Sequence, residues 1–423
     1  MSVHSPFPVL LALVALLSAC SKRPAPTSEP RSGAWHMELA LNGPVLPFQF
    51  DLTKRDSAHW SAIIHNGSEE IVVNDLVLRH DSFWLRMPLF DSEFIGTVIN
   101  DSVIKGEWAN YLKGPDYQIP FVAHAGGGPR FAGPSDGAAT IAGTWEVHFS
   151  QNTPDAYDAI GLFEQHEGGQ ATGTFITETG DYRFLEGSVH GDSLKLSCFD
   201  GSHAFLFAAS LRGDSLVGRY WSGTHWEEPW VAYRNPQFEL RDPYALTTLK
   251  EGYDMVDFRL PDLNGALISS SDERFKGKVL LVQVMGSWCP NCVDETVLLN
   301  ELYTEYRAQG MEVLAVAFEK YEEPGKAVTA LKRFQKALNV GYPIVHGGQA
   351  TKENAAEKLP FLTRLMSYPT CIIVDRNGMV RRIRAGFYGP STGEHYQNYR
   401  RNLRIFLEEL LAEPGPANQI RHS

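Results

Sequence analysis

Residues 33–235 show a hydrophobic pattern that is typical of β-strands. Apolar and polar residues alternate in short runs such as "AWHMELAL", "EIVVNDLVLRH", "FIGTVIND" and "FLFAASLRGDS", so each run places its apolar side chains on one face. Asn-Gly, Gly-Asp and Asp-Ser pairs, which favour tight turns, separate the runs. The pattern therefore predicts an all-β region built from antiparallel hairpins.

This β region contains two copies of one unit. "GAWHMEL" recurs as "GTWEVHF" 110 residues later, and "DSVIKGEW" recurs as "DSLVGRYW" 113 residues later. An offset that changes so little indicates two domains of ordinary size, which we place at residues 33–125 and 140–235. The Gly/Pro-rich segment 126–139 between them is expected to be a linker.

Each copy opens with Gly-x-Trp and continues as hairpins, so each resembles a small lipocalin-like barrel or sandwich. The tryptophans of this region could line a ligand cavity, although we expect them mainly in cores and at rims. They include Trp35, Trp84, Trp108, Trp145, Trp221, Trp226 and Trp230. The histidines show no spacing that is typical of metal ligands, and we assign them no metal. They are His36, His59, His65, His148, His203 and His225.

The C-terminal part of the chain has the hydrophobic pattern of an α/β domain. The apolar run at 279–285 predicts a buried strand, "ETVLLNELYTEYRAQG" predicts an amphipathic helix that Gly310 ends, and "MEVLAVAFE" predicts another buried strand. Strands that alternate with helices indicate a mostly parallel sheet with helices on both faces. We place this domain at residues 253–413, between a linker at 236–252 and a tail at 414–423.

Length and composition are those of a globular protein with several domains. The chain has 423 residues, of which 43% are hydrophobic and 21% are charged, and this is enough apolar material for two or three cores. Its net charge of −12 argues against a general nucleic-acid binder, because such a surface repels phosphates. Five cysteines are few for a disulfide scaffold of this size.

Residues 1–20 have the pattern of an export signal. The apolar run in "PVLLALVALLSAC" is too short to span a bilayer, and Leu17–Cys20 resembles the bacterial lipobox, in which the cysteine is lipidated. A lipid on Cys20 would tether the protein to a bacterial membrane, inner or outer, facing the periplasm. Residues 21–32 would then be a Pro-rich spacer. An ordinary cleaved signal is the alternative, since no Lys or Arg precedes the apolar run.

Cys289 and Cys292 are the candidate reactive residues, and export would place them where disulfides persist. A zinc site needs more ligands than this single pair offers, and a two-residue spacer closes too small a loop for a structural disulfide to stabilise much. A redox pair is therefore the favoured interpretation, and it requires a Cys289 sulfur that is exposed, electron-rich and within bonding reach of Cys292. Pro290 suits a first helical turn, so a helix N-terminus would stabilise a Cys289 thiolate. Cys292, one turn further on, could attack a mixed disulfide formed at Cys289.

Three motifs in the C-terminal part carry a family resemblance. "DFRLPDLNG", "SWCPNC" and "YPTCIIVDRNG" together resemble the extracytoplasmic thioredoxin-like proteins of the TlpA/ResA type, which are related to the AhpC/TSA redoxin group. The resemblance covers residues 253–412 and implies a thioredoxin-like α/β fold with a central insertion at about 320–362. It also implies a protein-disulfide oxidoreductase that needs no cofactor beyond a redox-active Cys289–Cys292 disulfide.

Family roles can be carried over to the residues that match these motifs. Trp288 would shield the nucleophile, and Pro290 would be among the residues that contact the substrate. Pro369 corresponds to a cis-proline that lies against the disulfide, with Tyr368 and Thr370 offering backbone groups to an incoming client. An ordinary trans proline at the start of a strand is the alternative for Pro369.

The polar residues near the motif differ from those at the same positions of cytoplasmic thioredoxins. Gln283 stands where those proteins bury a proton-relaying aspartate, and an amide cannot titrate. The membrane-anchored branch tends to place a glutamate three residues after the second cysteine, here Glu295, and we expect it to take the proton of Cys292. A simple helix-dipole role for Glu295 is the alternative. We expect Glu319 at the solvated surface and Cys371 as a buried, inert thiol.

The resemblance implies a membrane-tethered enzyme that exchanges disulfides with exported proteins, usually in the reducing direction. Apocytochrome c and other disulfide clients would be its partners, and a membrane thiol reductant would supply electrons. A thiol peroxidase is one alternative, although Val282 and Gly286 replace the Pro and Thr of its peroxide pocket. The other alternative is a binding or docking lipoprotein in which the β repeats dominate, and for these repeats we expect docking or spacing.

Overall fold

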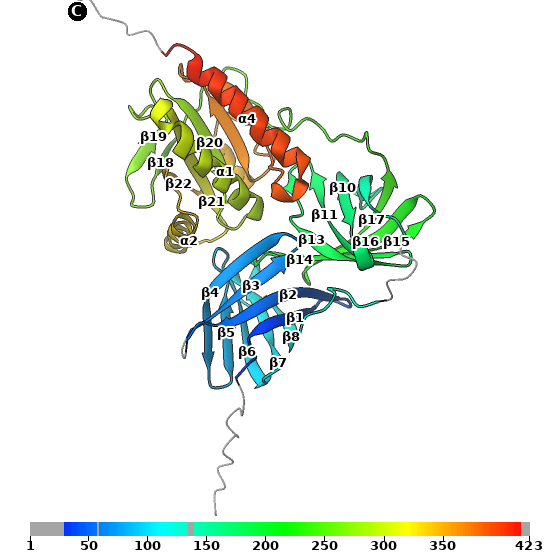
Figure 1. Ribbon diagram of the computed structural model, residues 1–423. Helices are drawn as coiled ribbons and strands as arrows, with labels where there is room; N and C mark the ends of the chain where they lie inside the picture. Colours follow the sequence, from blue (N-terminus) through cyan, green and yellow to red (C-terminus); the bar gives the residue numbers. More distant parts are fainter. Residues whose placement is uncertain (1–28, 57–58, 134–138, 416–423) are drawn as a thin grey trace, which may run out of the picture.

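A computed structural model describes residues 29–56, 59–133 and 139–415, which form two β-barrels and one α/β domain (Figure 1). The expected export signal, the lipidation site Cys20 and most of the spacer lie outside the described residues. Within the described part, no helix combines the length and the apolar character that a membrane crossing requires.

The first β domain is a closed barrel of eight antiparallel strands in sequence order. β1 pairs with β2 and also with β8, where Trp35 lies opposite Ala125, and this second pairing closes the sheet. Inward-facing side chains such as Phe48, Phe94 and Trp108 fill the interior. The strands are β1 (Gly33–Ala40), β2 (Val45–Lys54), β3 (Trp60–Asn66), β4 (Glu69–Arg79), β5 (Ser82–Arg86), β6 (Ser92–Asn100), β7 (Val103–Asn110) and β8 (Gln118–Ala125), with the 3₁₀ turn η1 (Tyr111–Lys113) between β7 and β8.

The second β domain closes in the same way, so the prediction of two all-β copies is confirmed. β10 pairs with both β9 and β11, which joins eight strands into a ring, and the short β12 extends β11. Phe149, Phe175 and Phe207 lie in its core. The elements are β9 (Gly143–Phe149), β10 (Tyr157–Gln165), η2 (Glu167–Gly169), β11 (Gln170–Thr177), β12 (Gly180–Asp181), β13 (Leu185–His190), β14 (Ser193–Phe199), β15 (Ala204–Arg212), β16 (Ser215–Ser222) and β17 (Trp226–Arg234).

The tryptophans of the barrels divide into core and surface residues. Those buried in the two cores include Trp35, Trp108, Trp145 and Trp230. Trp84 of the first barrel and Trp226 of the second are instead 42% and 43% exposed. The expectation that tryptophans mainly pack in cores is confirmed for the first group.

The C-terminal domain is built on a five-stranded sheet of order β22-β21-β20-β23-β24. β20, β21 and β22 are parallel, whereas β23 is antiparallel to both β20 and β24. The prediction of a mostly parallel sheet is therefore confirmed for β20, β21 and β22 and wrong for the pairings of β23. A turn at Asn377 and Gly378, where Gly378 has a φ of 85°, joins β23 to β24 as a hairpin. The strands are β18 (Arg259–Pro261), β19 (Leu267–Ser269), β20 (Val279–Met285), β21 (Met311–Glu319), β22 (Ile344–Gln349), β23 (Thr370–Val374) and β24 (Val380–Ala385).

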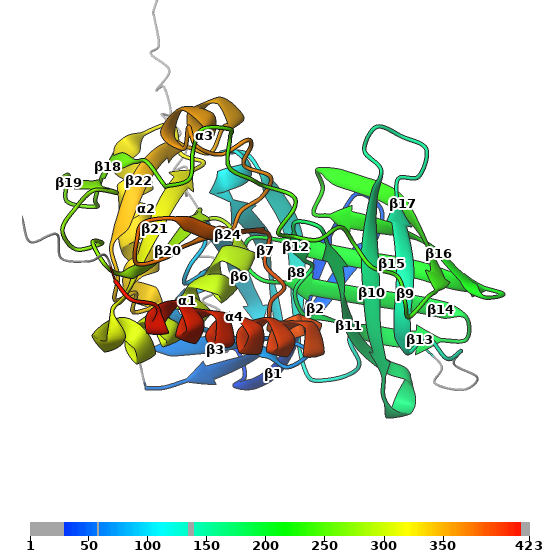
Figure 2. The same cartoon turned by 90° about the horizontal axis from the view of Figure 1, so that it is seen from above.

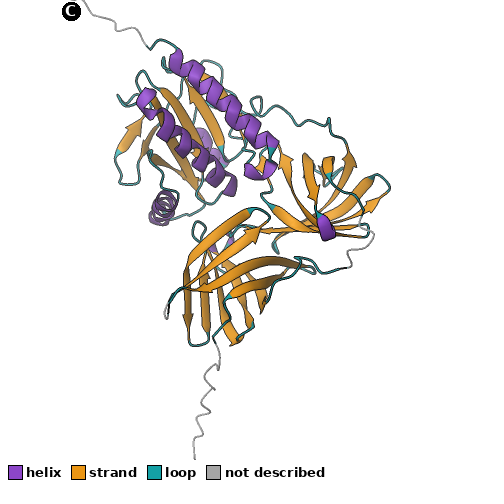
Figure 3. Ribbon diagram, in the orientation of Figure 1, coloured by secondary structure: helices purple, strands orange, loops and turns teal. Residues whose placement is uncertain are grey.

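The α-helices of the described residues all belong to this third domain (Figure 3). Side chains of α1, α2 and α4 share one apolar cluster on one face of the sheet, and α3 packs with β18 and β19 on the other face. The segment "KENAAEKLPFLTRLM" predicts a helix over residues 352–366. α3 ends instead at Lys358, because Pro360 disfavours helix at the residue before it. The helices are α1 (Pro290–Tyr306), α2 (Pro324–Ala337), α3 (Lys352–Lys358) and α4 (Glu394–Ala412), with the 3₁₀ turns η3 (Arg307–Gln309) and η4 (Pro390–Thr392).

The three domains are packed against one another. Phe199 of the second barrel shares an apolar cluster with the interior of the first, and its ring stacks on Phe48 at a centroid distance of 4.7 Å. Phe90, between β5 and β6, belongs to the apolar core of the α/β domain. α4 begins beside β11 of the second barrel (Figure 2). Both barrels therefore contact the domain that carries the two reactive cysteines.

Candidate redox site

The two cysteines lie at the junction between β20 and α1. Cys289 is the N-cap residue of α1 and Pro290 is its first helical residue, as the motif predicts. The backbone N–H of Cys292 donates a hydrogen bond to Sγ of Cys289 at 3.2 Å, and both residues are free thiols. This geometry places the Cys289 sulfur at the positive end of the helix, where a thiolate is stabilised.

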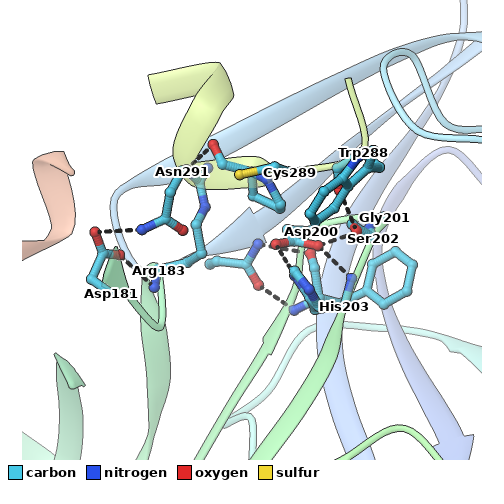
Figure 4. Close-up of polar contacts among 12 residues, drawn as sticks. Asp181, Arg183, Asp200, Gly201, Ser202, His203, Trp288, Cys289 and Asn291 are labelled. Carbon is cyan, nitrogen blue, oxygen red and sulfur yellow. Dashed lines mark hydrogen bonds and ion pairs between the residues drawn. The ribbon is translucent and has the colours of Figure 1, made fainter. Parts of the chain in front are cut away.

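Cys289 is covered, contrary to the expectation of an exposed sulfur. The residue is only 6% exposed. Its Sγ donates to the carbonyl oxygen of Tyr368 at 3.5 Å, and the loop 200–203 of the second barrel lies across the motif (Figure 4). Within that loop, the hydroxyl of Ser202 donates to the carbonyl oxygen of Trp288 at 3.2 Å. The sequence could not predict the contact with the loop 200–203, because this loop belongs to a separate domain.

The carboxylate of Asp200 holds this covering loop in shape. It accepts hydrogen bonds from the backbone N–H groups of Ser202 at 2.8 Å and His203 at 2.6 Å. Asp200 is itself buried, and the His203 ring lies 3.2 Å from its other oxygen. A loop fixed at both the backbone and the side chain can hold a defined position over the motif.

The residues expected to contact a client surround Cys289. The Tyr368–Pro369 peptide bond is cis, as the motif predicts, and the Tyr368 ring lies edge-on to Trp288 at a centroid distance of 5.3 Å. The indole N–H of Trp288 donates to the carbonyl oxygen of Phe318 at 2.9 Å. Thr370 is buried at the start of β23. These residues form one wall beside the nucleophile.

Sequence analysis misjudged one charged residue at the end of β21, Glu319, and missed the next one, Lys320. Glu319 is buried, not solvated, and accepts hydrogen bonds from the N–H and hydroxyl of Ser287 at 2.7 and 2.8 Å. Burial raises the pKa of Glu319 to about 7, although the bonds from Ser287 oppose the rise. The ammonium of Lys320 lies 4.1 Å from the centroid of the Trp288 ring. The uninterrupted apolar run of β21 was a usable signal, since a strand covered on both faces also buries its last residue.

Glu295 and Gln283 lie under Cys292 in the domain core. Neither carboxylate oxygen of Glu295 has a hydrogen-bond partner among the described residues. Gln283 donates to the carbonyl oxygen of Cys292 at 3.4 Å and accepts from the hydroxyl of Thr296 at 3.1 Å. Burial raises the pKa of Glu295 to about 7, with Gln283 and Arg384 opposing the rise. An unpartnered buried carboxyl beside a thiol is suited to exchange protons near neutral pH.

Cys292 and Cys371 are poor nucleophiles as they stand. Burial raises the pKa of the Cys292 thiol well above its ordinary value, and the neighbouring Cys289 raises it further. Burial also raises the pKa of Cys371 well above its ordinary value. Cys292 therefore needs a base when it attacks, and Glu295 is the buried carboxylate one helical turn away.

Replacing Glu295 by glutamine should make the protein less sensitive to alkaline pH. The carboxyl titrates near its ordinary pKa of 4.5 when unfolded and at about 7 when folded, so the folded state binds the proton more tightly. The unfolding free energy therefore falls as pH rises between these values, by an amount on the order of 3 kcal/mol. Glu295→Gln should remove this loss, which urea unfolding at pH 4.5 and pH 8 would measure.

A matched control for this prediction is Glu301→Gln on the same helix, where the Glu301 carboxylate is 46% exposed. Its substitution should change stability little at either pH. The assignment of Glu295 as a buried, unpaired acid would be contradicted if Glu295→Gln shifted stability equally at both pH values.

Arg183 joins all three domains next to the motif. Its guanidinium is buried and forms ion pairs with Asp294 of α1 and Glu69 of β4. It also donates to the carbonyl oxygen of Pro290 at 3.4 Å. A guanidinium that two carboxylates share out of solvent fixes their domains relative to one another.

Asp181 of the second barrel also bonds the α/β domain next to the motif (Figure 4). It accepts hydrogen bonds from the side-chain amide of Asn291 at 3.4 Å and from the N–H of Gly389 at 2.6 Å. Asn291 is the residue between the two cysteines that follows Pro290, so the second barrel bonds the redox motif itself. Sequence reasoning missed both Asp181 and Arg183, since nothing in the local pattern of the second barrel marks either residue as a contact with another domain.

The fold and the site define a thioredoxin-like domain with a cysteine pair at its first helix, and the family model and the sequence relatives agree. The AhpC/TSA family model matches residues 252–383. The thiol-disulfide oxidoreductase ResA of Geobacillus kaustophilus is 32% identical over 140 residues, which cover 33% of this chain and 72% of that protein. ResA of Bacillus subtilis is 28% identical over 151 residues, which cover 36% of this chain and 76% of that protein. A secreted thiol-disulfide isomerase from Corynebacterium glutamicum, of known structure, has 18% identity and a TM-score of 0.31, covering 42% of this chain and 99% of its own.

The chain belongs, through its C-terminal domain, to the TlpA/ResA-type thioredoxin-like proteins, and it is a thiol–disulfide oxidoreductase. The matched segments of the two ResA proteins correspond to about a third of the chain.

Proposed function

We propose that the protein reduces disulfides of exported proteins through Cys289 and Cys292. The observation that carries the proposal is the sulfur of Cys289 at the N-terminus of α1, bonded by the N–H of Cys292 and lying against the cis Tyr368–Pro369 peptide. Tyr368, Pro369, Thr370, Pro290 and Trp288 would form the surface on which the client disulfide lies.

The first step would be attack by the Cys289 thiolate on one sulfur of the client disulfide. A mixed disulfide forms between Cys289 and the client, and the second client sulfur leaves as a thiolate that takes up a proton. The helix N-terminus and the ammonium of Lys320 favour the negative charge on Cys289 before the attack.

The second step would be attack by Cys292 on Sγ of Cys289. Glu295 takes the proton of Cys292, the new Cys289–Cys292 disulfide forms, and the client is released as a dithiol. The client has then gained two electrons and the enzyme has lost them. A thiol reductant in the membrane would reduce the Cys289–Cys292 disulfide back to two thiols. Apocytochrome c would be one class of client.

Tethering through a lipid on Cys20 would hold the enzyme at a bacterial membrane, facing the periplasm. The lipobox-like Leu17–Cys20 and the Pro-rich segment after it support this location. We also propose that both barrels are lipocalin-like, because each is a closed, antiparallel ring of eight strands. The contacts of the second barrel with Asn291 and Asp294, and the packing of Phe90 of the first barrel in the α/β core, favour a role as part of the enzyme over a separate docking function.

The reducing direction can be tested by equilibrium titration of the full chain against glutathione and dithiothreitol, with alkylation to count free thiols. We expect a reduction potential below about −180 mV, in the range of proteins that donate electrons. A value near about −120 mV, which is typical of strongly oxidising catalysts, would contradict the reducing direction while leaving disulfide exchange intact.

A further inference from the structure

A cavity of about 580 Å³ lies where the mouth of the second barrel meets the redox motif. Its barrel side is largely aromatic and includes Tyr182, Phe205 and Tyr220. On its other side lie Asn291 and Tyr368, which flank Cys289. A volume of this size is within the range of about 300–1,000 Å³ that is common for ligand pockets. The cavity thus begins beside the nucleophile and continues toward the second barrel.

The charged residues of this cavity are mainly acidic. Asp158, Glu178, Asp181 and Glu228 line it, and Arg183 is the one Lys or Arg among the described lining residues. The guanidinium of Arg183 is already paired with two carboxylates of other domains. Two of the lining carboxylates also have partners, since Glu178 pairs with Arg241 and Asp158 lies 2.7 Å from the His148 ring. The remaining surplus of negative charge, on Asp181 and Glu228, favours a ligand that carries a positive charge.

Hydrogen bonds hold the cavity wall in place. The buried carboxylate of Glu228 accepts from the hydroxyls of Ser150 at 2.6 Å and Tyr157 at 2.8 Å. The hydroxyls of Tyr157 and Tyr182 lie 2.7 Å apart. Because bonded side chains lose little freedom when a ligand arrives, such a wall is suited to recognition.

We propose that this cavity binds the client segment next to the reacting cysteine, and that it selects an aromatic side chain followed by Lys or Arg. The proposal rests on the proposed function, since the client must bring its disulfide to Cys289. A client chain bonded there passes Tyr368, whose carbonyl oxygen lies 3.5 Å from the nucleophilic sulfur, and so reaches the cavity. Trp226 lines the cavity and is 43% exposed, so its ring is free to stack on an aromatic or cationic side chain.

The test compares disulfide substrates with the full-length protein and a dithiol reductant. One peptide disulfide carries Trp-Arg beside each cysteine, a second of equal length carries Ser-Glu, and hydroxyethyl disulfide is too small to reach the cavity. Trp226→Ala should lower kcat/KM for the Trp-Arg peptide about five- to tenfold and leave hydroxyethyl disulfide unchanged. Trp84→Ala is the matched control, because Trp84 is 42% exposed on the other barrel.

Each outcome of this test decides a separate point. The acidic cavity is supported as the subsite if the protein prefers the Trp-Arg peptide and this preference weakens in 0.5 M salt, because salt screens charges. Equal kcat/KM for both peptides, or an equal loss in Trp226→Ala and Trp84→Ala, overturns the subsite and leaves the proposed function intact. Failure of the unsubstituted protein to reduce any of the three disulfides would overturn the proposed function and the subsite with it.

Discussion

Replacing Cys289 by serine is expected to abolish disulfide exchange, whereas replacing Cys292 by alanine should stop the reaction halfway. A serine hydroxyl is not an anion at neutral pH and cannot form the mixed disulfide. Without Cys292, no neighbouring thiol resolves the bond at Cys289, so clients should accumulate on the enzyme. Turnover of a model disulfide and mass spectrometry of trapped, non-reduced complexes would measure the two effects.

Cys198→Ala is the matched control for these variants. Cys198 is a fully buried cysteine in the core of the second barrel, and burial raises the pKa of its thiol well above the ordinary value. Its removal should leave turnover unchanged. Appreciable turnover by Cys289→Ser, or trapped clients bonded at Cys198, would show that the reactive sulfur had been assigned wrongly.

Replacing Asp294 by asparagine is expected to expose Cys289. Asp294 is the carboxylate of α1 that pairs with the buried Arg183 of the second barrel, and losing one partner of a buried ion pair commonly costs about 3–5 kcal/mol. Because Glu69 still pairs with Arg183, we expect part of this cost and a rise of about ten- to a hundredfold in the rate of Cys289 alkylation. Iodoacetamide labelling followed by peptide mass spectrometry would measure that rate.

The control for this second prediction is Glu305→Gln, also on α1. Glu305 pairs with Arg404 at the surface, with side chains 44% and 28% exposed, and exposed pairs contribute at most about 1 kcal/mol. Alkylation of Cys289 should be unchanged in this variant. The prediction would be wrong if Asp294→Asn lowered the unfolding midpoint of the protein but left the rate of Cys289 alkylation unchanged. Clients would then reach Cys289 without any separation of the barrels from the redox domain.

Local patterns predicted the elements of this protein well. The Gly-x-Trp starts and the turn pairs are properties of adjacent residues, and they were sufficient to find both β domains. The strand-to-helix junction at Pro290 followed from a short motif in the same way. Closure of the barrels could not be predicted, because it depends on pairing β1 with β8 and β10 with both of its neighbours.

Contacts between domains were beyond the reach of such patterns. Phe90, Arg183 and Ser202 are unremarkable turn residues in their own barrels, yet they contact the α/β domain or the redox motif itself. Their importance follows only from the packing of three separately patterned units. For the same reason, the motif predicted an exposed Cys289, whereas the residue is 6% exposed and Ser202 of the second barrel bonds the neighbouring Trp288.

The most direct test of the account is to identify which sulfur atoms become bonded when the intact protein is oxidised. The protein would be equilibrated with oxidised glutathione, its free thiols blocked with iodoacetamide under denaturing conditions, and its peptides mapped by mass spectrometry. We expect a Cys289–Cys292 disulfide that dithiothreitol reverses, with Cys198 and Cys371 recovered as alkylated thiols. A Cys289 that stays unbonded, or that pairs with either of the other two, would contradict it.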